Sequence, residues 1–357
     1  MTDARQDDGT PVVNSRLVSG SENIDDHASA PHTLSVVVPV YQGEKTLAAL
    51  IAEIDPLTRE QATPGGHRFI VDEVLFVYDN GPDASDRVIR ELEAQYPYAR
   101  GIWLSRNFGQ HAATLAGMAS AGSDWIVTLD EDGQHDPAEI AGLLDTAMTE
   151  HASVVYAKPI NEAPHGALRN SASRMAKRTL EWFTGTSGAT DYQSFRLVLG
   201  SIGRSVAAYA GSGVYLDVAL GWVAGRIVTS PVSLREEGDR RSGYSPRRLF
   251  GHFLRMVLTS GTRGLRLVAF LGIAVAALGV IVAIVVLVQR LVGDIAIEGW
   301  ASTMIVILLS SGAILFSLGI VAEYIGINVN MAMGRPPYLI TSDPHDGPLG
   351  RGPHRAR

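Results

Sequence analysis

The sequence predicts an α/β protein with a doubly wound, mostly parallel sheet, followed by two membrane-spanning helices. Over residues 34–157, short valine-rich apolar runs alternate with helical segments of about ten to fifteen residues, the pattern of strands and crossover helices. Two longer uncharged apolar runs, at residues 267–288 and 301–322, are of roughly bilayer-spanning length. With 357 residues, the chain has room for one large domain and a membrane appendage.

The strands of the predicted sheet are near-continuous runs of β-branched and apolar residues, as expected for strands buried on both faces. The pattern places them at residues 34–40, 72–78, 101–104, 125–129 and 154–157. Helices are expected between them, at about residues 44–54, 85–95, 108–121 and 137–150.

A cluster of polar residues follows the run at residues 125–129, in the stretch LDEDGQHDP. Asp130 and Asp132 are two residues apart and Gln134 follows, so two carboxylates and an amide oxygen can reach one Mg²⁺ or Mn²⁺. The alternative is an acidic turn before a helix, with Asp136 as its N-cap and Pro137 as its first residue.

Tyr41 and Asp79 follow the first two predicted strands in the same way. Because ligands of open α/β sheets bind beyond the carboxyl ends of the strands, Tyr41, Asp79 and the Asp130 cluster are expected to line one crevice. Asp-Asn-Gly is also good turn chemistry, so Asp79 could instead be a turn residue. No glycine-rich phosphate loop follows the first strand, so a nucleotide would be held by carboxylates, a metal and basic side chains.

Two later segments offer such basic side chains. Residues 165–183 predict an amphipathic helix that carries Arg169, although a charged helix face is usually only solvated. Arg196 lies among uncharged neighbours in the stretch DYQSFRL, which makes it the better phosphate ligand.

Composition excludes several classes of function. The net charge of −7 argues against nucleic acid as the main partner. The absence of cysteine excludes disulfides, thiolate zinc sites and thiol nucleophiles. Residues 1–32 are polar and Asp-rich without an apolar core, which predicts a disordered tail and no signal peptide.

The flanks of the two apolar runs predict their orientation. Arginines precede the first run and follow the second, whereas the connecting loop holds one arginine against two acidic residues. The positive-inside rule then predicts an integral protein of the inner or plasma membrane, with its large domain and both termini in the cytoplasm.

Small residues recur along the first run at Gly272, Ala276, Gly279 and Ala283. Such a stripe favours packing against the second run or against a neighbouring subunit of a homo-oligomer, unless it reflects only the abundance of Gly and Ala in membrane helices.

Residues 235–266 hold eight arginines and an apolar helical face. An amphipathic, arginine-bearing helix beside a membrane span is expected to lie in the interface and attract anionic lipids. The alternative is a helix packed on the large domain.

Taken together, these residues resemble the family 2 glycosyltransferases. More narrowly, the chain resembles the membrane-anchored polyprenyl-phosphate glycosyltransferases, which include dolichyl-phosphate mannose synthase and the undecaprenyl-phosphate formamido-arabinose transferase. The resemblance runs over about residues 34–333 and is carried by the stretches LSRNFGQHAATLAGM, LDEDGQHDPAEI, DYQSFRL and SGYSPRRL and by the two apolar runs.

The resemblance implies a GT-A fold, a nucleotide-sugar donor, a divalent metal and a polyprenyl phosphate acceptor. UDP-sugars are favoured, with GDP-mannose as the other donor considered. Carried over position by position, the motifs imply a nucleotide site at Pro39, Tyr41, Glu44, Asp79 and Arg106. They also imply metal ligands at Asp130, Asp132 and Gln134, phosphate contacts at Arg169 and Arg196, and catalytic roles for Asp130, Asp132 and Arg196.

The implied organisation places a GT-A domain at residues 33–234, a basic juxtamembrane segment at 235–266, a transmembrane hairpin at 267–326 and a cytoplasmic tail at 327–357. A processive polysaccharide synthase is one alternative, but its channel would need more membrane helices. A catalytically weak, lipid-binding membrane scaffold is the other. An NAD-dependent enzyme is opposed by the missing glycine fingerprint.

Overall fold

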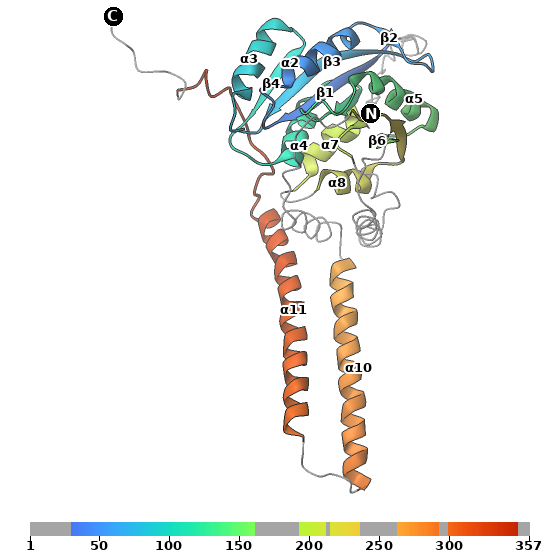
Figure 1. Cartoon of the computed structure of the whole chain (residues 1–357), viewed down its shortest axis with the longest axis vertical. Coiled ribbons are helices and arrows are strands. Elements are labelled where there is room, and N and C mark those ends of the chain that lie inside the picture. The colour runs from blue at the N-terminus through green and yellow to red at the C-terminus, as the bar shows by residue number, and fades with distance from the viewer. Residues whose placement is uncertain (1–29, 161–192, 212–214, 236–262, 293–298, 349–357) are drawn as a thin grey trace, which may run out of the picture.

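The computed structural model describes residues 30–160, 193–211, 215–235, 263–292 and 299–348. Its centre is a sheet in the order β8-β6-β7-β5-β1-β3-β4-β9, with β2 paired to β3 at the side (Figure 1). The strands are β1 (His32–Val40), β2 (Gln61–Ala62), β3 (Arg68–Tyr78), β4 (Ala99–Leu104), β5 (Trp125–Thr128), β6 (Val154–Pro159), β7 (Arg196–Leu199), β8 (Ile227–Val232) and β9 (Ile340–Thr341).

The sheet is mixed but mostly parallel. Strand β1 pairs in parallel with both β3 and β5, β3 pairs in parallel with β4, and β6 with β8. The α/β prediction is therefore confirmed. Strand β7 lies between β5 and β6 and pairs antiparallel with both. The strands β5 and β6, which follow one another in the predicted alternation, are therefore not neighbours in the sheet. Periodicity identifies a buried strand but carries no information on its partner.

Helices cover both faces of the sheet. One face carries α2 (Leu47–Ile54), α3 (Ser85–Gln95) and α5 (Ile140–Glu150), and the other α4 (Gln110–Ser120), α7 (Gly200–Tyr209) and α8 (Leu216–Val223). The apolar residues form one cluster on each face. Val36 and Val38 belong to the first cluster and Val37 to the second, which explains why β1 had to be apolar at successive positions.

Short 3₁₀ turns precede or extend two helices, η1 (Asp55–Thr58) and η2 (Pro137–Glu139). At η2 the Asp136 carboxylate accepts the Ala138 N–H at 2.9 Å. The expected cap at Asp136 is thus present, and it leaves the carboxylates of Asp130 and Asp132 for other partners.

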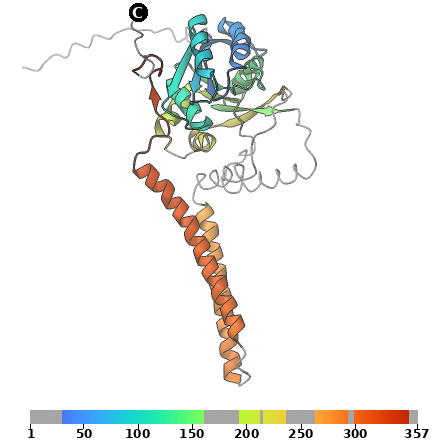
Figure 2. The ribbon, with the colours of Figure 1, turned by 60° about the vertical axis from the view of Figure 1, so that its left-hand side comes forward.

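Two long helices, α10 (Arg263–Val292) and α11 (Trp300–Ala332), lie side by side and extend away from the sheet (Figures 1 and 2). Within the described residues, one helix is long and apolar enough to cross a membrane, at Leu309–Ala332, and its most apolar 18-residue stretch has a mean hydropathy of 1.7. This span overlaps the expected run at 301–322, and α11 contains the whole of that run. In α10 the apolar stretch is the shorter Val268–Val282, so two spans, as the sequence predicted, are not established by length and composition.

Two residues of the small-residue stripe of α10, Gly272 and Gly279, do not contact α11. A Cβ atom added at Gly272 or Gly279 would meet no atom within 4 Å. The expected packing against the second helix is therefore wrong at these two positions, while packing against another subunit stays a prediction.

The chain returns to the sheet after α11. Strand β9 pairs antiparallel with the edge strand β4, although the sequence analysis treated residues 327–357 as a tail (Figures 1 and 2). Helix α11 also continues to Ala332, past the expected boundary at 326. The predicted tail at 1–32 falls almost entirely, and the predicted helix at 165–183 wholly, outside the described residues, as does most of the juxtamembrane segment.

Candidate functional site

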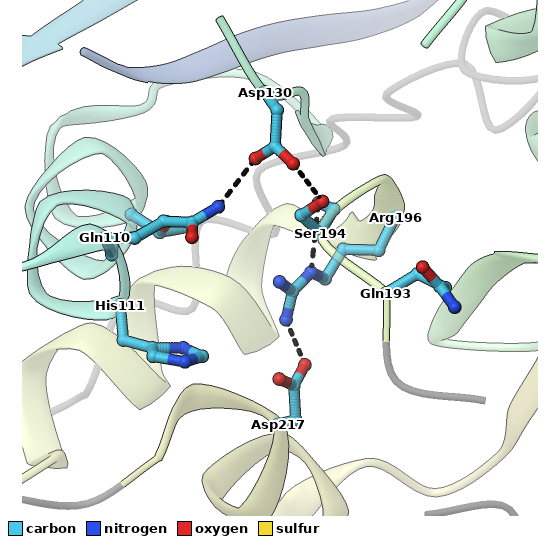
Figure 3. A pocket seen from close by; sticks show the side chains of 8 residues that line it. Gln110, His111, Asp130, Gln193, Ser194, Arg196 and Asp217 are labelled. Carbon is cyan, nitrogen blue, oxygen red and sulfur yellow. Dashed lines mark hydrogen bonds and ion pairs between the residues drawn. The ribbon is translucent and has the colours of Figure 1, made fainter. Parts of the chain in front are cut away.

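Two neighbouring cavities open at the carboxyl edge of the sheet. The larger, of about 430 Å³, is lined by residues that follow β1, β3, β4 and β5: Pro39, Val40, Tyr41, Asp79, Asn107, Gly109, Gln110, Ala113, Asp130, Glu131 and Asp132. The smaller, of about 220 Å³, is lined by Gln110, His111, Thr114, Asp130, Gln193, Ser194, Arg196 and Asp217 (Figure 3). Asp130 and Gln110 line both. Tyr41, Asp79, Asp130 and Asp132, which the strand ends predicted to converge, line the same cavity.

Asp79 holds the β4–α4 loop. Its Oδ1 accepts the Phe108 N–H and its Oδ2 accepts the Gly109 N–H, both at 2.7 Å. Burial raises the pKa of the Asp79 carboxyl, while these two hydrogen bonds and the charge of Arg106 act in the opposite direction. A carboxylate that accepts two backbone N–H groups fixes their positions, so Asp79 shapes the wall of the larger cavity.

The turn after Asp79 brings the backbone of Gly81 close to the backbone of Tyr41. Asn80 has a φ of 51°, and a Cβ at Gly81 would lie 1.6 Å from the carbonyl oxygen of Tyr41. Only glycine fits there. The segment therefore forms the expected turn, and Asp79 at its start also lines the larger cavity, so the turn does not rule out a site role for Asp79.

Glu131, which the sequence analysis left unassigned, ties the first loop to the acidic cluster. Its two carboxylate oxygens accept the backbone N–H groups of Tyr41, at 3.0 Å, and Gln42, at 2.9 Å. Glu131 stands between Asp130 and Asp132 but serves the backbone of the β1–α2 loop. Its position in an Asp-Glu-Asp run gave no sign of that partner.

The Asp130 carboxylate accepts hydrogen bonds from two side chains of the cavity wall. Its Oδ1 accepts the Gln110 Nε2–H at 2.6 Å and its Oδ2 accepts the Ser194 hydroxyl at 2.5 Å (Figure 3). Burial raises the pKa of Asp130, against the opposing charge of His135. His135 was also unassigned from sequence; it is buried against Phe195, with ring centroids 5.1 Å apart, and burial lowers its pKa.

The acidic cluster offers the donor atoms that a hard cation prefers. Asp130 and Asp132 line one cavity, and Asp132 Oδ1 accepts the Gln134 N–H at 3.1 Å across the left-handed Gly133, whose φ is 75°. Gln134 itself lines neither cavity. Among the described residues, no group of three or more His, Asp or Glu side chains could hold a metal. A Mg²⁺ or Mn²⁺ held by Asp130 and Asp132 would thus need further ligands from an amide, substrate phosphates or water.

Arg196 lies in the wall of the smaller cavity with its charge already paired. Its side chain is 4% exposed and forms an ion pair with Asp217, whose side chain is 9% exposed. The Tyr156 hydroxyl donates to the same Asp217 oxygen at 2.9 Å. Asp217 is 21 residues from Arg196 and on another element, so nothing in the sequence around Arg196 indicated this partner.

The remaining predicted residues lie away from the cavities or outside the description. Arg106 stacks its guanidinium over the Phe108 ring, 4.0 Å from the centroid, and lines neither cavity. Glu44 faces α3, where it accepts the Ala84 N–H at 3.4 Å and pairs with Arg87 at 3.7 Å. Arg169 falls outside the described residues.

Known proteins resemble this chain over most of its length. The undecaprenyl-phosphate 4-deoxy-4-formamido-L-arabinose transferase of Klebsiella pneumoniae (strain 342) is 31% identical over 312 residues, which cover 86% of this chain and 92% of that protein. Its counterpart in Aeromonas hydrophila is 27% identical over 314 residues, with the same coverage. The uncharacterized glycosyltransferase YkcC of Bacillus subtilis is 29% identical over 309 residues, again with 86% and 92% coverage.

Among solved structures, a glucosyl-3-phosphoglycerate synthase from Mycobacterium tuberculosis overlaps 66% of this chain and 79% of its own, with 19% identity and a TM-score of 0.46. The family model described as glycosyl transferase family 2 matches residues 35–205, which include most of β1, all of β2 to β7 and every residue that lines the larger cavity. With this match and the identity to the Klebsiella protein across nearly its whole length, the chain belongs to glycosyl transferase family 2.

Proposed function

We propose that this protein is a membrane-anchored glycosyltransferase that moves one sugar from a nucleotide-sugar donor to a polyprenyl phosphate. The observation that carries the proposal is the convergence of Tyr41, Asp79, Asp130 and Asp132 on one cavity at the carboxyl edge of the sheet. This cavity occurs in a chain that matches undecaprenyl-phosphate sugar transferases over about nine-tenths of their length. A UDP-sugar is the favoured donor class, and GDP-mannose is the second.

The larger cavity would hold the nucleotide. Tyr41 is 44% exposed and lines this cavity, while Asp79 and Glu131 fix the two loops that form its walls. Asp130 and Asp132 would hold a Mg²⁺ or Mn²⁺ ion. When bound, this ion stabilises the negative charge that develops on the leaving diphosphate. Gln110 and Ser194 orient the Asp130 carboxylate by donating to its two oxygens.

The reaction is a single displacement at the anomeric carbon. An oxygen of the acceptor phosphate forms the new bond to that carbon as the bond to the nucleoside diphosphate breaks, so the anomeric configuration inverts. A phosphomonoester has a second pKa of about 6 and is largely ionised at neutral pH, so the acceptor needs no general base. The smaller cavity, beside Asp130 and walled by Arg196, is the space in which the reacting phosphates would meet.

The position of β9 supports a two-span hairpin. Because β9 belongs to the same sheet as β1 to β8, the chain beyond α11 is on the same side of the membrane as the transferase domain. A helix α11 that crosses the bilayer therefore requires a second crossing before it, and α10 is the helix available among the residues described between the domain and α11. We assign the domain and both termini to the cytoplasm on the charge of the flanks. Residues 33–234 together with β9 form the transferase domain in this assignment.

The deciding experiment supplies full-length protein with radiolabelled UDP- and GDP-sugars, undecaprenyl phosphate, and Mg²⁺ or Mn²⁺. We expect one donor to label the lipid with a single sugar. Undecaprenol, which lacks the phosphate, should accept nothing, and Asp130→Asn should abolish labelling. A polymeric product would indicate a polysaccharide synthase, and the absence of both transfer and donor hydrolysis would indicate a scaffold.

A further inference from the structure

The segment that follows α11 makes a compact set of contacts with the sheet edge. The Ser105 N–H donates to the Leu339 carbonyl at 3.0 Å, and Thr341 Oγ1 donates to the Trp103 carbonyl at 3.3 Å. Tyr338 is half-buried and packs against the apolar cluster on the α4 face, as Phe108 of the β4–α4 loop also does. We call residues 338–343 the C-terminal clamp.

The clamp is closed by an ion pair at its far end. Arg90 on α3 donates from Nε and Nη2 to the two oxygens of Asp343, at 2.6 and 2.9 Å. The same guanidinium pairs with Asp86 at 2.9 Å and lies 4.8 Å from the centroid of the Trp103 ring. The Asp343 side chain is only 13% exposed. A bidentate, partly buried pair of this kind holds its two partners in one geometry.

The clamp contacts the start of the β4–α4 loop, which forms part of the wall of the larger cavity. Ser105, which donates to Leu339, begins the loop that leads from β4 to α4. Four residues on, Gly109 lines the larger cavity and donates, together with Phe108, to Asp79. The other end of the clamp joins α11 through residues 333–337, a connection that spans at most ~18 Å.

We propose that the C-terminal clamp is a positioning element for the donor site: it holds the β4–α4 loop in the conformation that binds the nucleotide-sugar. Residues 105–109 are then fixed from two sides, by Asp79 and by the clamp. Because the clamp is the continuation of α11, anchoring in the membrane and donor binding are coupled through it. The kinetic part of this inference rests on the proposed transferase function, whereas the structural part does not.

The first test compares two shortened chains, one ending after Pro337 and one ending after Gly347. Hydrogen exchange of residues 105–109 should become faster in the shorter chain and stay as in the full chain in the longer one. The KM for the donor should rise several-fold in the shorter chain alone, with kcat little changed. Equal exchange and equal donor KM in the two chains would overturn the proposal.

A second test uses point variants. It tests the positioning role of the clamp even if the shorter chain fails to fold. Asp343→Ala should speed exchange at residues 105–109 and raise the donor KM, and Asp343→Glu should restore both. The matched control is Asp346→Ala, because the Asp346 side chain is 82% exposed and, among the described residues, its ion pair is with His345, at 3.8 Å; its backbone N–H, which donates to the Asp343 carbonyl at 3.1 Å, is kept in this variant. If Asp343→Ala behaves like Asp346→Ala, the clamp does not position the loop. Exchange that responds as expected in a protein without transferase activity would sustain the clamp and refute only the proposed function.

Discussion

Replacing Asp217 by Asn should destabilise the transferase domain far more than a comparable change at the surface. The substitution keeps the size of the side chain and an oxygen that can accept from Tyr156, but it removes the charge that faces Arg196. Both side chains of the pair are almost fully buried, at 4% and 9% exposure. The Arg196 guanidinium would then remain buried without its ion-pair partner, with the more distant Asp130 as the remaining carboxylate near it.

The expected loss follows from that burial. Breaking a buried ion pair by removing one partner costs about 3–5 kcal/mol, since the remaining charge is left uncompensated. A domain of ordinary stability has about 5–15 kcal/mol in all. Asp217→Asn should therefore remove a large fraction of the free energy of unfolding and shift the urea midpoint strongly downward.

The chain supplies a matched control in the pair between Arg226 and Glu150. It also joins an arginine to a carboxylate, but its side chains are 56% and 45% exposed. Glu150→Gln should change stability by about 0–1 kcal/mol, as exposed pairs do. Both variants can be measured by urea unfolding of the full-length protein, followed by tryptophan fluorescence.

Equal midpoints for Asp217→Asn and Glu150→Gln would refute the reasoning from burial. A second comparison separates the charge from the packing. Removing both partners, in Arg196→Met with Asp217→Leu, should recover much of the stability lost in Asp217→Asn, because no buried charge is left. The double variant should nevertheless transfer no sugar if Arg196 acts on the phosphates.

Three further outcomes are expected. Asp132→Asn should lower kcat for transfer by about 10²–10³-fold, the usual effect of losing one preorganised electrostatic group; Asp136→Asn, which alters a helix cap, should keep kcat, and equal rates would place the metal elsewhere. The hydrogen bond from Arg90 lowers the pKa of Asp343 below the usual 3.8. The ion pair therefore stabilises the fold fully above pH 3.8, and this stabilisation is lost as the pH falls through the lowered pKa of Asp343. The stability difference between wild type and Asp343→Asn should accordingly shrink in urea melts on acidification, and a constant difference would contradict the pairing. A reporter fused after Arg357 should be cytoplasmic and one in the 289–300 loop external; finding both on one side would exclude the hairpin.

The strands and their polar ends could be predicted because the physics behind them is local. A run of β-branched residues has one good environment, between two layers of helices, and the residues just after it must lie at the sheet edge. For this reason the sequence alone predicts that Tyr41, Asp79 and Asp130 lie together, as they do in the larger cavity. The alternation of strands and helices likewise predicts α3 with its observed bounds, Ser85–Gln95.

Features that depend on partners distant in the sequence could not be predicted. The two residues of β9 have no periodicity to detect, and their place beside β4 depends on the path of the chain through α10 and α11. The role of Glu131 could not be predicted either, because a carboxylate between two others in the sequence gives no sign that it will accept the backbone N–H of Tyr41.

Arg196 shows how a correct local observation can lead to an incomplete chemical conclusion. Its uncharged neighbours in sequence suggested a free guanidinium that would meet a diphosphate, yet Asp217 comes from α8 and neutralises it in the fold. An arginine already paired adds less net positive charge to the smaller cavity than a free one. Charge stabilisation of the leaving diphosphate would then depend mainly on the metal at Asp130 and Asp132, with Arg196 supplying orientation by its remaining N–H groups. On this argument Asp132→Asn should reduce transfer more than Arg196→Lys, which keeps the charge beside Asp217 and loses the planar fork. The reverse order of the two kcat values would mean that the Arg196 guanidinium itself carries the stabilisation.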